Sequence, residues 1–464
     1  MSDTIAAFAT PPGIGGVAVL RISGPDAERI LGNVFQQASG KSGKIFVSHM
    51  LTYGMLIDPA TGDIIDECMA VLMRAPRSFT REDVAEIHCH GGSAVMEWAL
   101  RVVMEQGARA ADPGEFTRRA FENGRIDLTQ AEAVMRLIGA RGEAAARAAV
   151  RQLSGGVSRF INEVSDELIR ALAGIDAAID FPDEVEEQET AATLADISEK
   201  LSHKLEQSCN PRAGHVLDDG LDVVIAGAPN AGKSSLLNAL LDEDRAIVHS
   251  TPGTTRDVLS AEIVIDGIRV KLSDTAGLRD TDDPVELIGV ERARKRLAQA
   301  DLVLMMVDVS VPMKLDSYAH TMITEAADSL TDRMVILLNK CDLTADMDES
   351  FFNTITPKLP MLRISAKTGE GLDAVRELIA EHAALLTPES AILTGARHTS
   401  SALAAARSLM DAAVTLRDEG LEGATLDLAA IDLRVALHEL ESVTGANTDE
   451  TVIDTIFSTF CVGK

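Results

Sequence analysis

The chain has 464 residues, of which 46% are hydrophobic and 25% charged, and it carries a formal net charge of -29. This length suggests two to four globular domains. The negative charge excludes a generally basic surface for nucleic acids, and 3% aromatic residues give no sign of stacking platforms for single strands, so any nucleic-acid contact must be local.

The five cysteines form no CxxC pair, which disfavours a disulfide framework or a structural zinc site and favours a reducing compartment. The first residues lack a basic flank and are interrupted by prolines and glycines, unlike a signal peptide. The longest apolar stretch, Leu302 to Val307, is too short to span a membrane. We therefore expect a cytoplasmic protein without membrane association.

The first 117 residues have the pattern of a mixed α/β unit. Its candidate strands are Val17 to Ile22, Leu51 to Ile57, Cys68 to Met73 and Val84 to Cys89. From Glu115 to about Leu217, helical spacing of Ala, Leu, Arg and Glu predicts a helical region. Breaks are expected at Gly155-Gly156 and at Phe181-Pro182.

From Leu221 to about Leu386, short β-branched runs alternate with helical segments, which is typical of a doubly wound, mostly parallel sheet. The helical pattern returns from about His398 to Val443. The simplest architecture is a helical domain made from two separated stretches, with another domain inserted between them.

Four motifs in this inserted region indicate a guanine nucleotide site. They are GAPNAGKS at 227–234, DTAG at 274–277, NKCD at 339–342 and SAK at 365–367. In the first, glycines let backbone amides face phosphate oxygens, Lys233 reaches the β and γ phosphates, and Ser234 can ligate Mg²⁺. The motif also lies between a predicted strand and a predicted helix, as a phosphate loop requires.

The later motifs select the base and complete the metal site. Asp342 can accept hydrogen bonds from the guanine N1 and exocyclic amine, which adenine does not match, so the expected ligand is GTP. Asp274 is expected to reach Mg²⁺, and Thr254 or Thr255 in GTTRD can sense the γ-phosphate.

The residue after DTAG is Leu278, where many GTPases have a glutamine that orients the attacking water. Another group must take that role, and the acidic candidates on the following loop are Asp280, Asp282, Asp283 and Glu286. Arg256 and Arg279 are candidates for a transition-state cation.

The expected GTP contacts lie in the four motifs and in the switch sequence between the first two. They are Asn230, Ala231, Gly232, Lys233, Ser234, Ser235, His249, Ser250, Thr251, Pro252, Gly253, Thr254, Thr255, Asp274, Thr275, Ala276, Gly277, Asn339, Lys340, Asp342, Ser365, Ala366 and Lys367.

The whole chain resembles the tRNA-modifying GTPase family MnmE, also called TrmE. The resemblance rests on TPGTTRD, on DTAGLR followed by VELIGVERA, and on the terminal CVGK. In the first half, TPPGIGGVAVLRISG, FTREDVAEIHCHGG and GEFTRRAFENGRIDLTQAEAV agree with the family pattern.

The resemblance implies a multidomain α/β protein with four segments. These are an N-terminal α+β domain for tetrahydrofolate binding and dimerisation (1–117), a discontinuous helical domain (118–217 and 387–464) and an inserted Ras-like P-loop GTPase domain (218–386).

The implied activity is GTP hydrolysis within a complex that adds a carboxymethylaminomethyl or aminomethyl group to carbon 5 of the wobble uridine of certain tRNAs. The implied partners are a second copy of the chain, the FAD-dependent protein MnmG (GidA) and tRNA. The one-carbon unit would come from 5-formyltetrahydrofolate or a related tetrahydrofolate.

Four positions match the family's folate-contacting residues: Arg21, Glu86, Arg125 and Lys464. A role for the terminal lysine requires the tail to dock back on an N-terminal domain, either its own or that of a second subunit, because chain ends usually fray.

The resemblance also implies which groups orient the attacking water and supply the transition-state cation. It implies potassium-stimulated hydrolysis after G-domain dimerisation, with Glu286 positioning the attacking water. The implied potassium ligands are Asn230, His249, Thr251 and Thr254, and those of Mg²⁺ are Ser234 and Thr255.

We include Lys233 with Glu286 among the catalytic residues, together with Cys461 as a candidate nucleophile. Lys464 could lower the pKa of the Cys461 thiol; the alternative is a buried, inert thiol. The His88-Cys89-His90 run favours a structural role over a metal site, because alternate residues of a strand face opposite sides.

Two other functions remain open. A regulatory GTPase that assembles ribosomal particles would usually add a basic RNA-binding domain, which this acidic chain does not offer. A folate-dependent one-carbon transferase with a vestigial GTPase is disfavoured by the complete set of nucleotide motifs.

Overall fold

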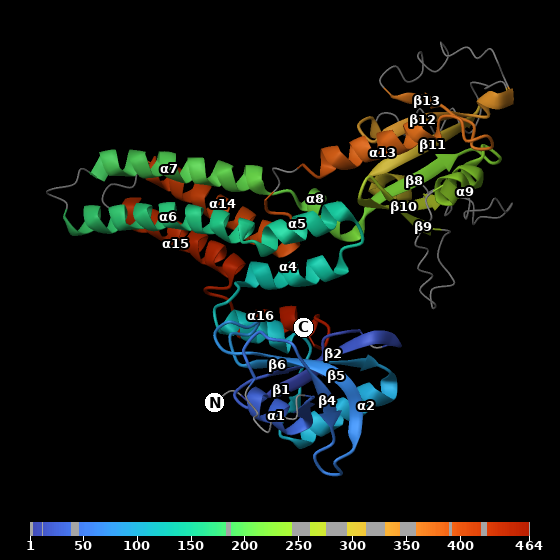
Figure 1. Ribbon diagram of the computed structural model, residues 1–464. Coiled ribbons are helices and arrows are strands. Elements are labelled where there is room, and N and C mark those ends of the chain that lie inside the picture. Colours follow the sequence, from blue (N-terminus) through green and yellow to red (C-terminus); the bar gives the residue numbers. More distant parts are fainter. Residues whose placement is uncertain are drawn as a thin grey trace, which may run out of the picture. The chain divides into compact units, whose positions relative to one another are not determined.

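The computed structural model describes residues 3–11, 13–38, 46–181, 187–243, 260–274, 295–311, 330–343, 359–388, 392–418 and 425–463 (Figure 1). The chain divides into two units. The first comprises Met1–Met135, Gln152–Ser198 and Ser408–Lys464, and the second comprises Arg136–Arg151 and Glu199–Arg407.

The N-terminal part of the first unit is built on a seven-stranded sheet with the order β3-β4-β5-β6-β2-β1-β7. Neighbouring strands are antiparallel except for the parallel pair β1 and β7. The strands are β1 (Ile5–Phe8), β2 (Gly15–Ser23), β3 (Phe35–Gln37), β4 (Thr52–Ile57), β5 (Ile64–Met73), β6 (Val84–Gly91) and β7 (Arg109–Ala110).

Helices α1 (Ala27–Val34) and α2 (Ser93–Glu105) pack against this sheet through one shared core. Strand β2 contributes Leu20 and Ile22 to that core, whereas Arg21 between them is only half-buried and belongs to the opposite face. The four predicted strands are confirmed as β2, β4, β5 and β6. The other three are only two to four residues long, too short for a period-two pattern.

The predicted helical region is confirmed. It contains α3 (Glu115–Glu122), α4 (Leu128–Gly139), α5 (Glu143–Leu153), α6 (Gly156–Asp180), α7 (Glu187–Ser208) and α8 (Pro211–Asp219). One predicted break coincides with the left-handed Gly155 (φ 80°), and the other coincides with the end of α6 at Asp180.

Helices that precede the nucleotide-binding region in the sequence pack against helices that follow it. Helix α6 buries Ile161, Val164 and Leu168 at helical spacing, and α15 (Thr425–Thr444) packs beside it (Figure 1). Elsewhere, Ser202 of α7 donates to the Ala406 carbonyl of α14 (Ala396–Leu416), at 2.8 Å. The helical domain is therefore discontinuous in sequence.

The second unit contains a six-stranded sheet with the order β13-β12-β11-β8-β10-β9, in which only β9 is antiparallel to its neighbour. The strands are β8 (Leu221–Gly227), β9 (Ser260–Ile265), β10 (Ile268–Asp274), β11 (Leu302–Asp308), β12 (Met334–Asn339) and β13 (Met361–Arg363). Four of these strands, β8, β10, β11 and β12, are formed by the short β-branched runs expected between Leu221 and Leu386.

Two separate cores lie on the two faces of this sheet. One includes residues of α8, α9 (Lys233–Glu243) and α13 (Leu372–Leu386), and the other includes Leu297 and Leu330. Because both faces are buried, the central strands read as continuous apolar runs. The expected doubly wound, mostly parallel sheet is confirmed.

The last helix, α16 (Glu450–Ser458), was not predicted from the sequence. It packs against α3 in the first unit, and Phe457 and Phe460 share a core with Leu128 and Ala131. Across the described residues, no helix has the combination of length and apolarity that a membrane span requires.

Candidate functional site

The phosphate-loop motif lies between the end of β8 and the start of α9, as its sequence predicts. Gly227 and Gly232 have φ angles of 146° and 101°, which side-chain-bearing residues rarely adopt. A Cβ at Gly227 would lie 2.4 Å from the Met306 carbonyl oxygen, and one at Gly232 would lie 2.3 Å from Nδ2 of Asn339. Both positions therefore require glycine.

Lys233 is folded into this loop. Its Nζ donates to the carbonyl oxygens of Gly227 and Ala228, each at 3.0 Å, and the residue is only 8% exposed. Burial lowers the pKa of Lys233, and the nearby Asp274 carboxylate opposes that shift. An ammonium with this placement can turn towards the phosphates of a nucleotide.

The two residues expected at a Mg²⁺ ion are brought together. The Ser234 hydroxyl donates to Oδ2 of Asp274 at 3.0 Å, and Asp274, the last residue of β10, is 2% exposed. A hydroxyl and a carboxylate are oxygen ligands of the kind Mg²⁺ prefers, so this pair fits the metal.

The NKCD and SAK motifs form one connected loop pair. Asn339 is buried, and its Nδ2 donates to the Ala231 carbonyl at 2.7 Å, while its Oδ1 accepts from the Ala366 amide at 3.0 Å. The Ser365 hydroxyl donates to Oδ1 of Asp342 at 2.7 Å. The Asp342 carboxylate is thus oriented but still exposed, as a contact to a guanine base requires.

The remaining described GTP-motif residues surround these contacts. Asn230 lies in the phosphate loop with φ 64°, and Ser235 is exposed in the first turn of α9. Lys340 forms an ion pair with Asp308 at the end of β11, and Lys367 is exposed.

Several predicted residues lie outside the described residues. These are the switch positions His249, Ser250, Thr251, Pro252, Gly253, Thr254, Thr255 and Arg256, the DTAG positions Thr275, Ala276 and Gly277, the following Leu278, Arg279, Asp280, Asp282, Asp283 and Glu286, and the terminal Lys464.

A second cluster of predicted residues lies on the face of the N-terminal sheet opposite α1 and α2. Arg21 and Glu86 are cross-strand partners on β2 and β6, and Arg21 Nε donates to Glu86 Oε1 at 2.8 Å. Both side chains are 17% exposed, so the pair is shielded but open to a ligand.

The ring of Phe79 joins this pair to Arg125. The Arg21 guanidinium carbon lies 5.6 Å from the Phe79 ring centroid, and that of Arg125 lies 4.7 Å from the same centroid. Arg125 Nη1 also donates to the Phe79 carbonyl at 2.8 Å. Sequence reasoning missed Phe79, whose only local signal was its place in the FTREDVAEIHCHGG motif.

The C-terminal segment docks on the N-terminal part of its own chain. Val462 forms an antiparallel bridge with Pro113, and the Gly114 amide donates to the Cys461 carbonyl at 3.4 Å. A Cβ at Gly463 (φ 92°) would lie 2.0 Å from the Phe8 carbonyl oxygen. Phe8 follows Ala7, which is the cross-strand partner of Arg21, so Gly463 lies near the second cluster.

Two expectations about cysteine and histidine can be compared with this geometry. Cys461 is exposed, so the expectation of a buried thiol is wrong, and its role as a nucleophile stays a prediction. In the His88-Cys89-His90 run, Cys89 is buried in the sheet core whereas His88 and His90 face away from it, as strand alternation predicts.

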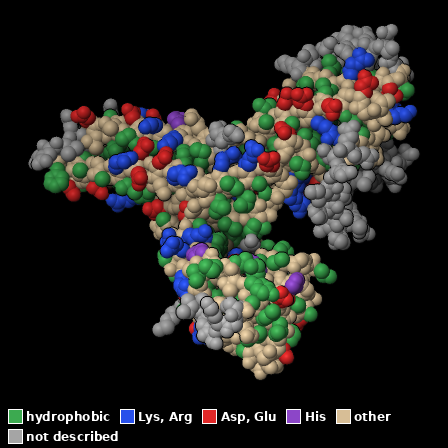
Figure 2. Space-filling model, viewed as in Figure 1, with side chains coloured by type: hydrophobic (Ala, Val, Ile, Leu, Met, Phe, Trp, Pro, Cys, Tyr) green, Lys and Arg blue, Asp and Glu red, His purple; other side chains and the backbone are tan. Residues whose placement is uncertain are grey.

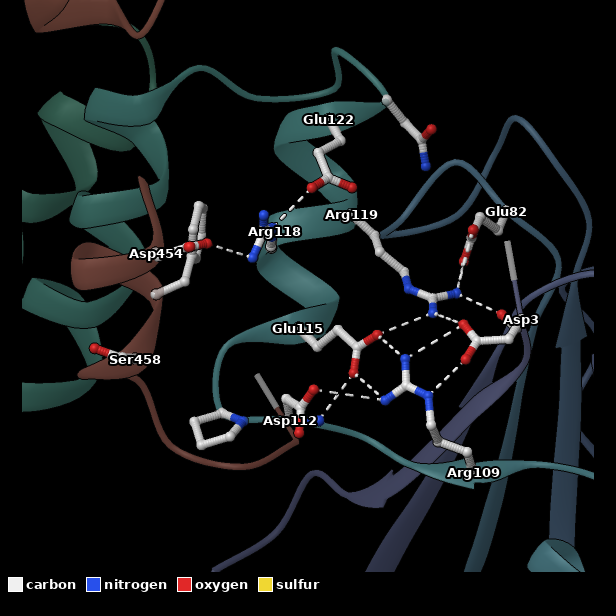
Figure 3. Close-up of a pocket in the computed structure, with 13 residues that line it drawn as sticks. Asp3, Glu82, Arg109, Asp112, Glu115, Arg118, Arg119, Glu122, Asp454 and Ser458 are labelled. Atoms are coloured by element: carbon white, nitrogen blue, oxygen red, sulfur yellow. Dashed lines mark hydrogen bonds and ion pairs between the residues drawn. The ribbon is translucent and has the colours of Figure 1, made fainter. Parts of the chain in front are cut away.

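A pocket of about 680 Å³, which sequence reasoning did not anticipate, lies beside α3 and α16. Figure 3 shows the residues that line it. Its arginines are already paired: Arg109 and Arg119 with Asp3 and Glu115, and Arg118 with Asp454. Hydrogen bonds from Arg109 and then Arg119 lower the pKa of Asp3 to about 2. The charged side chains that line this pocket form a network of ion pairs, which connects β7, α3 and α16 within the first unit.

The described residues contain no group of three or more His, Cys, Asp or Glu side chains that could hold a metal ion. Among the described residues, two arrangements suit a ligand: the phosphate loop with the Ser234–Asp274 oxygen pair, and the Arg21–Glu86 pair beside the Phe79 ring.

Known protein families match the parts of the chain that contain both arrangements. Residues 4–125 match the family model described as GTP-binding protein TrmE N-terminus, and residues 128–461 match the MnmE helical domain. The chain is 42% identical over 472 residues to the tRNA modification GTPase MnmE of Moorella thermoacetica, with 100% of each chain covered.

It is also 43% identical over 473 residues to the tRNA modification GTPase MnmE of Streptococcus pneumoniae, covering 100% of this chain and 99% of that protein. Among solved structures, it is similar to the G domain of the T. maritima FeoB iron transporter, at 26% identity and a TM-score of 0.27, over 35% of this chain and 98% of that one.

Proposed function

The chain belongs to the MnmE family of tRNA modification GTPases, and from this premise we propose the reaction that its GTP hydrolysis serves. It is a GTP-hydrolysing enzyme with a role in tRNA modification. In the proposed reaction, a carboxymethylaminomethyl or aminomethyl group is added to carbon 5 of the wobble uridine of certain tRNAs. The whole-length similarity favours this function over ribosome assembly.

The proposed source of the one-carbon unit is 5-formyltetrahydrofolate or a related tetrahydrofolate, held by the N-terminal part. The observation that carries this proposal is the convergence of Arg21, Glu86 and Arg125 around the ring of Phe79. The Glu86 carboxylate can accept hydrogen bonds from a pterin, the ring can stack on it, and the guanidiniums can bind carboxylates.

The end of the chain supports the same site. The docked segment brings the backbone of Gly463 to Phe8, so we propose Lys464 as a further folate contact. We also propose the exposed Cys461 as a candidate nucleophile near this site.

In the nucleotide site, Lys233 would leave the Gly227 and Ala228 carbonyls and contact the β and γ phosphates. Ser234, with Thr255, would hold Mg²⁺, which neutralises phosphate charge when bound. Asp342, oriented by Ser365, would select guanine.

We propose that dimerisation of the G domains activates hydrolysis, with potassium held by Asn230, His249, Thr251 and Thr254 in place of an arginine finger and with Glu286 orienting the attacking water. Because an arginine finger accelerates hydrolysis by roughly 10³ to 10⁵, we expect much faster GTP turnover in KCl than in NaCl at equal ionic strength. Equal rates in the two salts would remove potassium from the mechanism.

The proposed partners are a second copy of the chain, the FAD-dependent protein MnmG and the tRNA substrate. A cytoplasmic location is proposed because the role is in tRNA modification. The acidic surface, with its net charge of -29, favours a local contact with tRNA over a broad one.

Nucleoside analysis of tRNA tests the proposed reaction. Cells that lack this protein should lose the modified wobble uridine, and the wild-type gene should restore it. Glu286→Ala should bind GTP with nearly normal affinity, hydrolyse it slowly and fail to restore the nucleoside. A normal wobble-uridine profile in cells without the protein would exclude the reaction.

A further inference from the structure

Arg125 of the proposed folate site and the nearby Arg81 have no carboxylate partner among the residues that the structure describes. Arg81 donates to the backbone of Asn123, and Arg125 donates to the backbone of Phe79. In contrast, Arg21, Arg109 and Arg119 of the same unit pair with carboxylates. A chain with 72 acidic residues thus leaves two guanidiniums together without a counter-charge.

Three hydrogen bonds hold the two segments that carry these arginines side by side. Arg81 Nη1 donates to the Asn123 carbonyl at 2.9 Å, Asn123 Nδ2 donates to the Thr80 carbonyl at 2.7 Å, and Arg125 Nη1 donates to the Phe79 carbonyl at 2.8 Å. A guanidinium has five N–H donors, and each arginine uses one in these bonds. Both therefore keep donors for a ligand while their positions are fixed.

The backbone at Arg81 is strained. Its φ is 60°, in the left-handed region, where a residue with a Cβ costs roughly 1 to 2 kcal/mol and glycine does not. Its guanidinium lies near Gly124, whose Cβ would be 3.6 Å from Arg81 Nη1. Strain of this kind is often retained where a side chain has a function.

Electrostatics agrees with this geometry. The pKa of Arg125 is lowered first by burial and second by the positive charge of Arg81. Two guanidiniums that repel each other are stabilised when an anion binds between them, and their planar donor groups suit carboxylates.

We propose that Arg81 and Arg125 bind carboxylates of the folate's glutamate tail and give the site a preference for folates that carry several γ-linked glutamates. This inference rests on the proposed folate function. Arg21 and Glu86 are bonded to each other, and the Glu86 carboxylate suits the pterin. Arg125 contacts the same Phe79 ring, and Arg81 lies close to Arg125, while Glu82 next to Arg81 is bonded to Ser23 and Arg119 instead. Each added glutamate brings one more carboxylate to such a pair.

The test uses the full-length protein and two probes, 5-formyltetrahydrofolate with one glutamate and with five. The wild type should bind the five-glutamate form at least about tenfold more tightly, which corresponds to about 1.4 kcal/mol and is within reach of charge-assisted hydrogen bonds. Arg81→Gly, which relieves the strained backbone, should reduce this preference to less than about twofold. GTP affinity should not change.

Arg77→Gln is the matched control, since Arg77 is an exposed arginine in the same loop; it should keep the wild-type preference. Equal affinity of the wild type for the two probes overturns the inference while leaving the folate function intact. If Arg81→Gly lowers the affinity for both probes by the same factor, the inference is also overturned, because the arginine would then only maintain the shape of the loop. If Arg81→Gly loses tRNA binding but keeps the preference for the five-glutamate probe, the inference is overturned and Arg81 and Arg125 are assigned to an RNA phosphate instead.

Failure of the proposed folate function gives a different result from failure of this inference alone. In that case the wild-type protein binds neither probe, whereas failure of the inference alone leaves it binding both probes with equal affinity.

Discussion

Asn339 acts as a bridge between two loops of the nucleotide site. Its amide group bonds the phosphate loop at Ala231 and the SAK loop at Ala366, and the residue is 2% exposed. Its position in NKCD predicted a GTP contact, but both polar atoms of the side chain bond to protein backbone. Asn339 therefore fixes the distance between the phosphate-binding and base-binding loops.

Asn339→Ala should lower the free energy of unfolding of the nucleotide domain by about 2 to 6 kcal/mol, because two buried backbone groups lose their partners at about 1 to 3 kcal/mol each. GTP affinity should fall by at least about tenfold. Urea unfolding and nucleotide titration measure the two effects. Asn447→Ala, at an exposed site in the other unit, is the control. Unchanged GTP affinity in Asn339→Ala would show that the loops keep their spacing without this bridge.

Among the elements, the turn between α4 and α5 contacts the β9–β10 hairpin closely within the second unit. The Ala144 amide donates to the Gly267 carbonyl at 3.0 Å, and a Cβ at Gly142 would lie 2.4 Å from that oxygen. Arg141 Nη1 pairs with Glu262 at 3.0 Å. Strand β10 continues from this hairpin to Asp274, so a single strand connects the α4–α5 turn to the proposed metal site.

At the scale of the whole molecule, segments from opposite ends of the sequence meet in the first unit. Strand β1 contacts the docked C-terminal segment at Phe8 and Gly463, and aromatic contacts stabilise the approach: the ring centroids of Phe457 and Phe460 are 5.2 Å apart, and those of Phe457 and Phe121 are 6.2 Å apart. The proposal that Lys464 contacts folate therefore requires this docked arrangement of the preceding residues.

Gly463→Ala should release this segment, because the added Cβ would overlap the Phe8 carbonyl and the φ of 92° disfavours alanine. Carboxypeptidase should then remove the C-terminal residues at least about tenfold faster, and folate affinity should fall. Gly174→Ala, in α6, is the control, since nothing lies within 4 Å of its Cβ position. The docked tail is refuted if Gly463→Ala leaves both the digestion rate and folate affinity unchanged.

The sequence by itself determined the nucleotide chemistry and most helices and strands. A phosphate loop is contiguous, so the glycines, Lys233 and Ser234 carry their geometry in local order, and long amphipathic or apolar runs reveal their periodicity. Short strands such as β3 and β7 stayed hidden because they have too few residues to show a period.

Only the tertiary structure decided which distant residues meet. Arg21 and Glu86 face each other because β2 and β6 pair in one register, Phe79 joins them to Arg125 because two loops are bonded together, and Gly463 reaches Phe8 because the tail bridges Pro113. Strand register and the packing of remote segments follow from burial and hydrogen bonding summed over the whole domain, which no local pattern of residues encodes.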